Sequence, residues 1–141
     1  MAIPDSLIEI GRRAFAGCVS LRSIKLPSGL REISPGMFEN CVWLEYVKLP
    51  DSLVSIGERA FAGANLNSIH IPCGVVSIGR DAFLDNRVLS SIVIPSSVEQ
   101  ISRDAFSGHI NENLQIFLDR ETTIDIEQFP PRIQQRIVFR D

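Results

Sequence analysis

The stretch LRSIKLPSGLREISPGMFENCVW, residues 21–43, is the unit from which most of this chain is built. Its proline and its phenylalanine recur as two aligned series, with steps of 23, 23, 22 and 23 residues. The series are Pro4, Pro27, Pro50, Pro72 and Pro95, and Phe15, Phe38, Phe61, Phe83 and Phe106. A period of about 20–50 residues is typical of proteins in which each repeat forms one coil and packs against its neighbours. We therefore predict a repeat solenoid.

Each unit begins with a short segment of alternating side chains, which predicts a β-strand. In the unit quoted above, Ile24 and Leu26 are expected to point inward, whereas Ser23 and Lys25 point outward. Pro27 ends the strand because proline has no N–H group to donate to a sheet. The solenoid is therefore expected to be mainly β.

The second half of each unit carries a small residue and a pair that is usually Ala-Phe. Gly57 and Gly79 follow a core isoleucine, where a small residue fits a backbone bend or a close approach between coils. The pairs, such as Ala60-Phe61, are expected on short helical turns. Because the phenylalanines keep the repeat register, we predict that they stack as an aromatic spine in the core.

The consensus LxxIxLPxxLxxIGxxAFxxC resembles the BspA-like, or Treponema-type, leucine-rich repeat. The best match runs from Leu21 through Leu30, Ile33 and Phe38 to Cys41, and five copies carry the resemblance over most of the chain. It implies a right-handed leucine-rich-repeat solenoid with one parallel sheet face, and with loops, turns and short second strands on the other face. It also implies protein–protein interaction or adhesion, often at the surface of bacteria or parasitic protozoa, and it supplies no catalytic residues and no cofactor.

We divide the chain into a solenoid, residues 1–118, and a C-terminal cap, residues 119–141. The solenoid is expected to contain about five repeats of 23 residues and a last strand at 115–118. Beyond it the period is lost, and Pro131 suits the first position of a short helix that includes Ile137. A terminal coil must have its open face covered, and this is the role expected of the cap.

Composition argues against several functional classes. Fourteen basic residues against 17 acidic ones give a net charge of −3 without a basic stripe, so nucleic-acid binding is not expected. No apolar stretch approaches the roughly 20 residues of a membrane-spanning helix. The chain enters the repeat pattern at once, and no signal peptide is expected within it. The resemblance favours a cell-surface or secreted protein, whereas the residues themselves fit equally a cytoplasmic protein or a segment of a longer exported chain.

The three cysteines, an odd number, argue against a framework of disulfides. Cys18 and Cys41 share one repeat position on neighbouring coils, and they either form a disulfide or remain two small buried thiols. The second interpretation is favoured because free cysteine is commonly buried. Cys73 lies in a predicted turn and is expected to be the most exposed of the three.

Alternation along the strands places two columns of side chains on the outer side of the predicted sheet. The first contains Lys25, Lys48, His70, Val93 and Phe117, and the second contains Ser23, Tyr46, Ser68, Ser91 and Gln115. The place of Phe117 requires a one-residue insertion in the fifth coil. The resulting face runs from basic and polar at one end to apolar at the other. These residues either bind a partner or are simply the soluble residues that an exposed sheet needs.

Trp43 is a further, weaker binding candidate, since it lies in the turn that enters a strand. A role at an interface and partial burial of its ring against a neighbouring coil are both open. Catalysis and metal binding are not expected. His70 and His109 lie on different coils and belong to no recognised metal or nucleophile motif.

Two functions remain. The first is a non-enzymatic protein-interaction module, such as an adhesin, that binds a host or extracellular-matrix protein on the outward sheet face. The second is a structural or assembly unit in which the incomplete N-terminal coil pairs with another copy, because an uncovered end presents unpaired strand groups. The resemblance favours the first.

Overall fold

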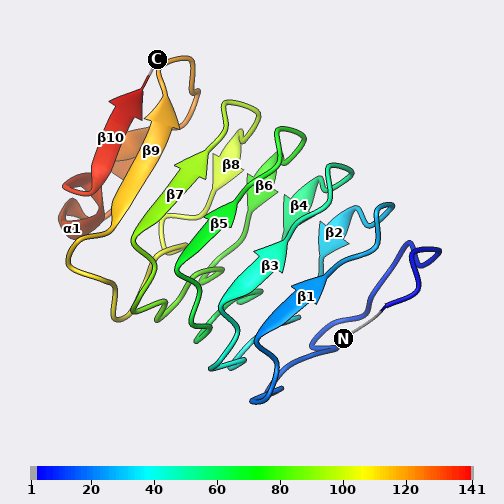
Figure 1. Ribbon diagram of the computed structural model, residues 1–141. Helices are drawn as coiled ribbons and strands as arrows, with labels where there is room; N and C mark the ends of the chain where they lie inside the picture. Colours follow the sequence, from blue (N-terminus) through cyan, green and yellow to red (C-terminus); the bar gives the residue numbers. More distant parts are fainter. Residues whose placement is uncertain (1–2, 141) are drawn as a thin grey trace.

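The computed structural model describes residues 3–140, and its chain winds as a solenoid with parallel strands on two sides (Figure 1). The ends of the two expected domains, residues 1–2 and 141, lie outside the described residues. One side carries β1 (Ser23–Lys25), β3 (Tyr46–Lys48), β5 (Ser68–His70), β7 (Ser91–Ile94), β9 (Gln115–Asp119) and β10 (Ile137–Arg140). The other side carries β2 (Glu32–Ile33), β4 (Ser55–Ile56), β6 (Ser77–Ile78) and β8 (Gln100–Ile101).

The first side is formed by a pair, β1–β3, and a four-stranded sheet, β5–β7–β9–β10, which lie next to each other (Figure 1). We call the outward side chains of these six strands the front face. The second side is a continuous sheet in the order β2-β4-β6-β8. The predicted solenoid with a parallel sheet face is therefore confirmed.

The register of the strands follows the buried side chain in the middle of each. Ile24 pairs with Val47, and Ile69 pairs with Ile92, so equivalent core residues stack from coil to coil. Ile92 pairs with Ile116, which is 24 residues further on and not 23. The fifth coil therefore contains the predicted one-residue insertion.

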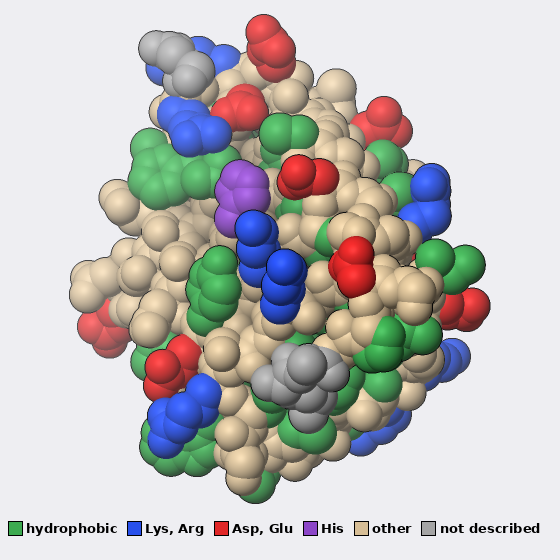
Figure 2. Space-filling view, turned by 45° about the vertical axis from the view of Figure 1, so that its right-hand side comes forward, with side chains coloured by type: hydrophobic (Ala, Val, Ile, Leu, Met, Phe, Trp, Pro, Cys, Tyr) green, Lys and Arg blue, Asp and Glu red, His purple; other side chains and the backbone are tan. Residues whose placement is uncertain are grey.

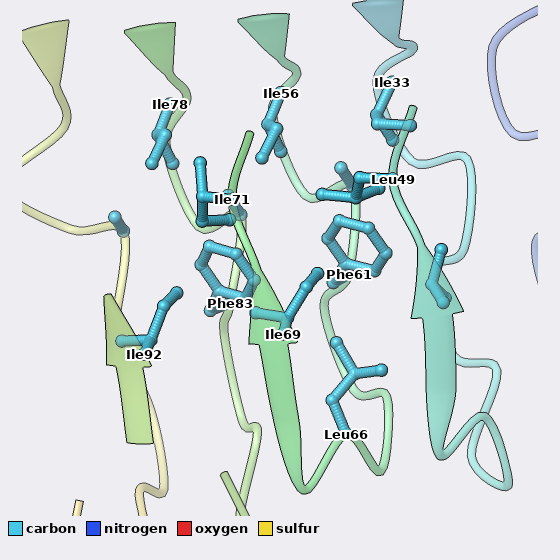
Figure 3. Packing of buried hydrophobic residues seen from close by; sticks show 14 of the residues in the cluster. Ile33, Leu49, Ile56, Phe61, Leu66, Ile69, Ile71, Ile78, Phe83 and Ile92 are labelled. Carbon is cyan, nitrogen blue, oxygen red and sulfur yellow. The ribbon is translucent and has the colours of Figure 1, made fainter. Parts of the chain in front are cut away.

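The phenylalanines form the predicted spine. Consecutive rings from Phe15 to Phe106 lie 5.4–5.6 Å apart between centroids and are nearly parallel, with interplanar angles of 7–11°. Figure 3 shows Phe61 and Phe83 beside Ile69 and Ile71 of the front strand segment, with Ile56 and Ile78 of the second sheet above them. Because the four rings from Phe38 to Phe106 are almost completely buried, the spine supplies much of the apolar area removed from water.

The segments that carry the phenylalanines are turns, and not the short helical turns expected from the sequence. Their N–H groups alternate between two kinds of partner. Phe61 donates to the carbonyl of Ala82 on the next coil at 2.9 Å, whereas Ala62 donates to Arg59 within its own turn at 3.2 Å. Every second N–H therefore links two coils, and a continuous helix cannot form because those groups are not available within it.

The core glycines allow the close approach between coils that the sequence predicts. A Cβ atom on Gly57 would lie 2.8 Å from both the carbonyl oxygen of Ile33 and the nitrogen of Pro35. A Cβ on Gly79 would lie 2.8 Å from the nitrogen of Glu58. These contacts are with backbone atoms of the preceding coil, so the small residue is required by stacking.

The C-terminal segment adds a further strand to the sheet, so 115–118 is not the last one. After the 3₁₀ helix η1 (Ile126–Gln128) and the short helix α1 (Pro131–Gln134), β10 pairs in parallel with β9. Pro131 begins α1 as predicted, but Ile137 lies in β10 and pairs with Ile116. The last coil is shorter than the repeat, and no Leu-Pro pair follows β10. The repeat pattern therefore does not predict this strand.

Candidate protein-binding face

The ten residues of the two outward columns all lie on the front face. Lys25, Lys48 and His70 are exposed, whereas Val93 and Phe117 are half-buried. In the neighbouring column Tyr46 is the most prominent side chain, with 57% of its surface exposed. The column continues on the other strands with small or neutral groups, namely Ser23, Ser68, Ser91 and Gln115. Their role in binding stays a prediction.

Along the first column, the side chains change from basic to apolar in the order of the strands. Lys25 pairs with Lys48 across β1 and β3, and His70 pairs with Val93 across β5 and β7. Val93 then pairs with Phe117, so the basic half of the face passes directly into an apolar half. In Figure 2 basic side chains and a histidine lie next to hydrophobic ones across the middle of the surface.

The apolar half extends one strand beyond the sequence-based prediction. Phe117 pairs with Val138 of β10, and 37% of the Val138 side chain is exposed. Val138 was missed because β10 was not expected. The alternation of Ile137, Val138 and Phe139 after a proline-initiated turn was the signal that could have indicated it.

A shallow pocket lies beside the basic half. It has a volume of about 230 Å³ and is lined by Lys25, Ser28, Lys48 and Asp51, with Leu26, Leu49 and Pro50 as its apolar part. The two ammonium groups and the hydroxyl of Ser28 can bind an acidic side chain of a partner, and the carboxylate of Asp51 can accept a basic one. A partner's side chain could insert into this pocket, whereas the rest of the front face offers contacts on its surface.

Trp43 packs against a neighbouring coil and remains half-exposed, and its role at an interface stays a prediction. Half of its surface is exposed, and the guanidinium carbon of Arg22, on the preceding coil, lies 5.2 Å from the centroid of its ring. Arg22 also pairs with Glu45 at 3.4 Å. This cation–π contact holds the indole in place while part of it stays accessible, just before the strand that carries Tyr46.

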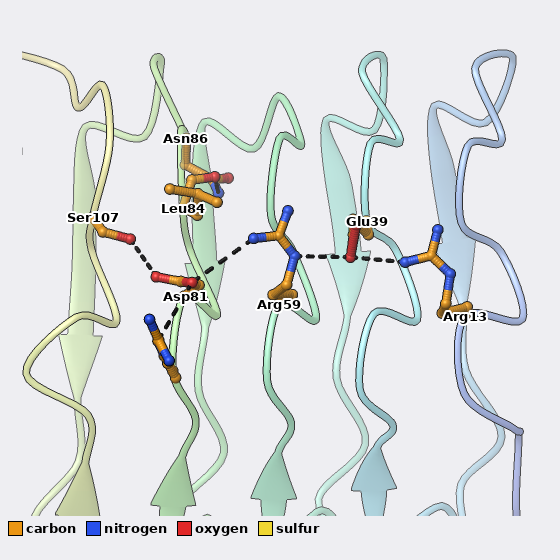
Figure 4. Close-up of polar contacts among 8 residues, drawn as sticks. Arg13, Glu39, Arg59, Asp81, Leu84, Asn86 and Ser107 are labelled. Carbon is orange, nitrogen blue, oxygen red and sulfur yellow. Dashed lines mark hydrogen bonds and ion pairs between the residues drawn. The ribbon is translucent and has the colours of Figure 1, made fainter.

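A row of charged side chains in the Phe-containing turns was not foreseen. Glu39 accepts from Arg13 at 3.0 Å and from Arg59 at 3.1 Å, and Arg59 also reaches Asp81 at 3.8 Å (Figure 4). Burial raises the pKa of Glu39, but the hydrogen bonds from the two arginines outweigh it and the pKa lies below its ordinary value. The row joins neighbouring coils and is structural.

The second sheet also has a groove, which the sequence did not reveal. It has a volume of about 700 Å³ and is lined by serines and glutamines, by Glu32 and Glu99, and by the segment 123–128, including Asp125. Among residues 3–140, no lysine or arginine lines it. The groove depends on the C-terminal segment lying against the solenoid, and this was not predictable from the repeat pattern.

The histidines are separate. His70 lies on the front face, whereas the backbone N–H and Nδ1 of His109 approach Oδ1 of Asp85 at 2.7 and 3.4 Å. The backbone hydrogen bond from His109 is the main reason why the pKa of Asp85 is lowered. Within residues 3–140 we find no group of three side chains suited to hold a metal ion, and no helix long and apolar enough to cross a membrane.

The cysteines are free thiols. Cys41 is buried and donates from Sγ to the carbonyl of Phe15 at 2.9 Å, and burial raises its pKa. Asn86, at the same repeat position, donates to the carbonyl of Phe61 at 2.8 Å. Ala64 occupies the same position without a side-chain donor, so this bond to the preceding coil is made by some coils and not by all. Cys18 is partly buried and Cys73 is exposed, as predicted.

These repeats match the family model described as the BspA type leucine-rich repeat region, in six copies over residues 1–113. The chain belongs to this family. A leucine-rich repeat protein of known structure from T. pallidum is 34% identical to this BspA-type chain, with a TM-score of 0.72. The alignment covers 80% of this chain and 52% of the T. pallidum protein. No curated protein matches the sequence.

Two other solved structures are similar to this BspA-type chain. A leucine-rich cell surface protein from Faecalibacterium prausnitzii is 25% identical, with a TM-score of 0.56, over 92% of this chain and 56% of that protein. The pneumococcal vaccine antigen PcpA is 19% identical, with a TM-score of 0.65, over 85% of this chain and 42% of its own, and this likeness concerns the fold alone. The chain therefore spans about half the length of the solved relatives.

Proposed function

We propose that this BspA-type chain is a non-enzymatic protein-interaction module that binds a partner protein on its front face, as an adhesin or a binder of a host or extracellular-matrix component. The family assignment supports protein binding, and the F. prausnitzii relative is described as a cell surface protein. The observation that carries the proposal is the combination of the exposed Tyr46 with Lys25 and Lys48 on one rigid sheet.

The physical argument is that this face offers a strong contact at a low entropic cost. Tyrosine and tryptophan are enriched among the residues that dominate binding energies, because each presents a large rigid ring with a polar tip. Tyr46 lies in β3 and Trp43 just before it, held by Arg22. Since the strands beneath are fixed by the stacked core, binding requires little ordering of the backbone.

The test is binding of the purified chain to a panel of extracellular-matrix proteins, measured in parallel with the triple variant Tyr46→Ala, Lys48→Ala, His70→Ala. A matched control replaces three exposed residues outside the front face, Arg12→Ala, Arg31→Ala and Glu58→Ala. Circular dichroism first establishes that all three proteins are folded. We expect saturable binding by the parent and the control, and loss in the front-face variant. Equal binding by all three would overturn the proposal.

A second candidate function, assembly through the N-terminal coil, is favoured by one observation. Ile8 has 75% of its surface exposed and Leu7 has 40%, so two large apolar side chains face outward on the first coil. We propose as the alternative that these side chains pair two copies. Sedimentation of the parent and of Ile8→Asp tests it: a concentration-dependent dimer lost in the variant supports assembly, and a monomeric parent contradicts it.

A further inference from the structure

We infer that the segment bound by the front face is an extended amphipathic peptide of the partner, which lies across the strands with a carboxylate at Lys25 and Lys48 and an apolar side chain at Phe117. This inference rests on the proposed function and adds the chemistry and the order of the partner's side chains. It follows from the first outward column, which is basic at Lys25 and Lys48 and apolar at Val93 and Phe117.

The basic half presents two ammonium groups that form no ion pair within residues 3–140, although Asp5 and Asp51 lie near them. Among the described residues, neither Lys25 nor Lys48 forms an ion pair. Asp5 is near enough to feel the charge of Lys25, but its two oxygens accept hydrogen bonds from the N–H and the hydroxyl of Ser28, each at 2.9 Å. Two neighbouring ammonium groups are therefore complementary to an acidic side chain.

The apolar half is a stripe of three side chains on adjacent strands. Val93, Phe117 and Val138 are partners in the register of β7, β9 and β10, and all remain at least partly open to water. An apolar side chain placed over Phe117 would remove its own surface and that of the stripe from water, which favours binding in proportion to the apolar area buried. A charged side chain would lose hydration there without gaining a partner.

The strand spacing sets the distance between the two contacts. Lys48 and Phe117 lie on β3 and β9, with β5 and β7 between them. Three spacings of about 4.8 Å correspond to about 14 Å, and an extended chain rises about 3.3 Å per residue. The carboxylate and the apolar side chain of the partner should therefore be about four residues apart. His70 and Val93 lie between and face the connecting residues.

A displayed library of random twelve-residue peptides, selected on the folded chain, tests this inference without a known partner. We expect the bound peptides to share Asp or Glu at three to five positions from Phe, Leu, Ile or Met. The double variant Lys25→Glu, Lys48→Glu should weaken them by roughly tenfold or more. A new selection on that variant should yield Lys or Arg at the acidic position. The control Arg12→Glu, Arg31→Glu has the same change of net charge outside the face, and should bind as the parent does.

The apolar contact is tested separately by Val93→Thr, Val138→Thr, which keeps the shape and the β-branching of both residues and so preserves the fold. It should weaken the peptides while leaving their salt dependence unchanged. Peptides that lose affinity in the front-face variants but carry no acidic-to-apolar order would overturn the inference and leave the proposed function standing. Peptides that bind every front-face variant as well as the parent would contradict both. A library that yields no binder would overturn the inference, while the protein panel still decides the proposed function.

Discussion

The Nε atom of Arg59 lies 3.1 Å from Oε2 of Glu39, on the preceding coil. The same carboxylate is also 3.0 Å from Arg13, one coil further back, and only one tenth of the Glu39 side chain is exposed. A carboxylate so enclosed stays charged only if it is paired and hydrogen-bonded. Glu39 therefore ties three successive coils together at a point where the repeat consensus has no charged residue.

Replacing Glu39 by Gln should lower the free energy of unfolding by about 1–2 kcal/mol, because the two arginines lose their anion while both remain partly solvated. Urea denaturation of the parent and the variant measures the difference. Glu58→Gln is the matched control, since Glu58 is exposed. The interpretation of Glu39 is wrong if the two variants are equally stable.

The same carboxylate predicts a dependence of stability on pH. The pKa of Glu39 in the folded chain lies below its ordinary value of 4.5, so the folded state binds its proton less readily than the unfolded state does. The stabilisation is complete above that ordinary value and disappears as the pH falls through the folded pKa. The difference in unfolding free energy between the parent and Glu39→Gln should therefore be constant near neutral pH and shrink below about pH 4.5. A difference that stays constant down to pH 3 would contradict this.

Truncation of the spine should destabilise the whole solenoid. Phe61→Ala removes a buried ring that stacks on Phe38 and Phe83, and should cost about 3–5 kcal/mol. Phe15 stacks on one side only and is partly buried, so Phe15→Ala should cost less. Thermal unfolding by circular dichroism compares them. An unchanged melting temperature for Phe61→Ala would refute the role of the spine.

The close approach of the coils makes equivalent glycines unequal. Gly57→Ala would place a methyl group against backbone atoms of the preceding coil and should cost about 1–3 kcal/mol. A Cβ on Gly11 would meet nothing within 4 Å, so Gly11→Ala should change stability by less than about 0.5 kcal/mol. Equal effects of the two substitutions in chemical denaturation would show that coil stacking does not select glycine here.

Features that repeat were predictable, because the five coils can be aligned and each shows which type of residue occupies a given position. The inward Ile24 and Ile92, the outward Lys48 and the stacked phenylalanines follow from period and alternation alone. The insertion before Phe117 was found because the apolar residues after it keep their alternation. The repeat pattern therefore predicts both columns of the front face.

Features that occur once were not predictable. The strand β10 follows a coil of irregular length, so Ile137 was placed in a helix. The row from Arg13 through Glu39 to Asp81 depends on side chains from different coils meeting in space, and the repeat consensus does not specify them. The second groove forms only where segment 123–128 lies against the second sheet. These parts depend on tertiary contacts without a local sequence signal.

The central claim, that the front face is the surface on which a partner protein binds, is tested most directly by site-specific photo-crosslinking. Benzoylphenylalanine would replace Tyr46 on the front face or, as the control, Ser77 on the second sheet. Each folded variant would be irradiated with the matrix protein that it binds in the panel. The account predicts a covalent adduct from position 46 and none from position 77. Adducts formed only from position 77 would contradict it and assign binding to the second sheet.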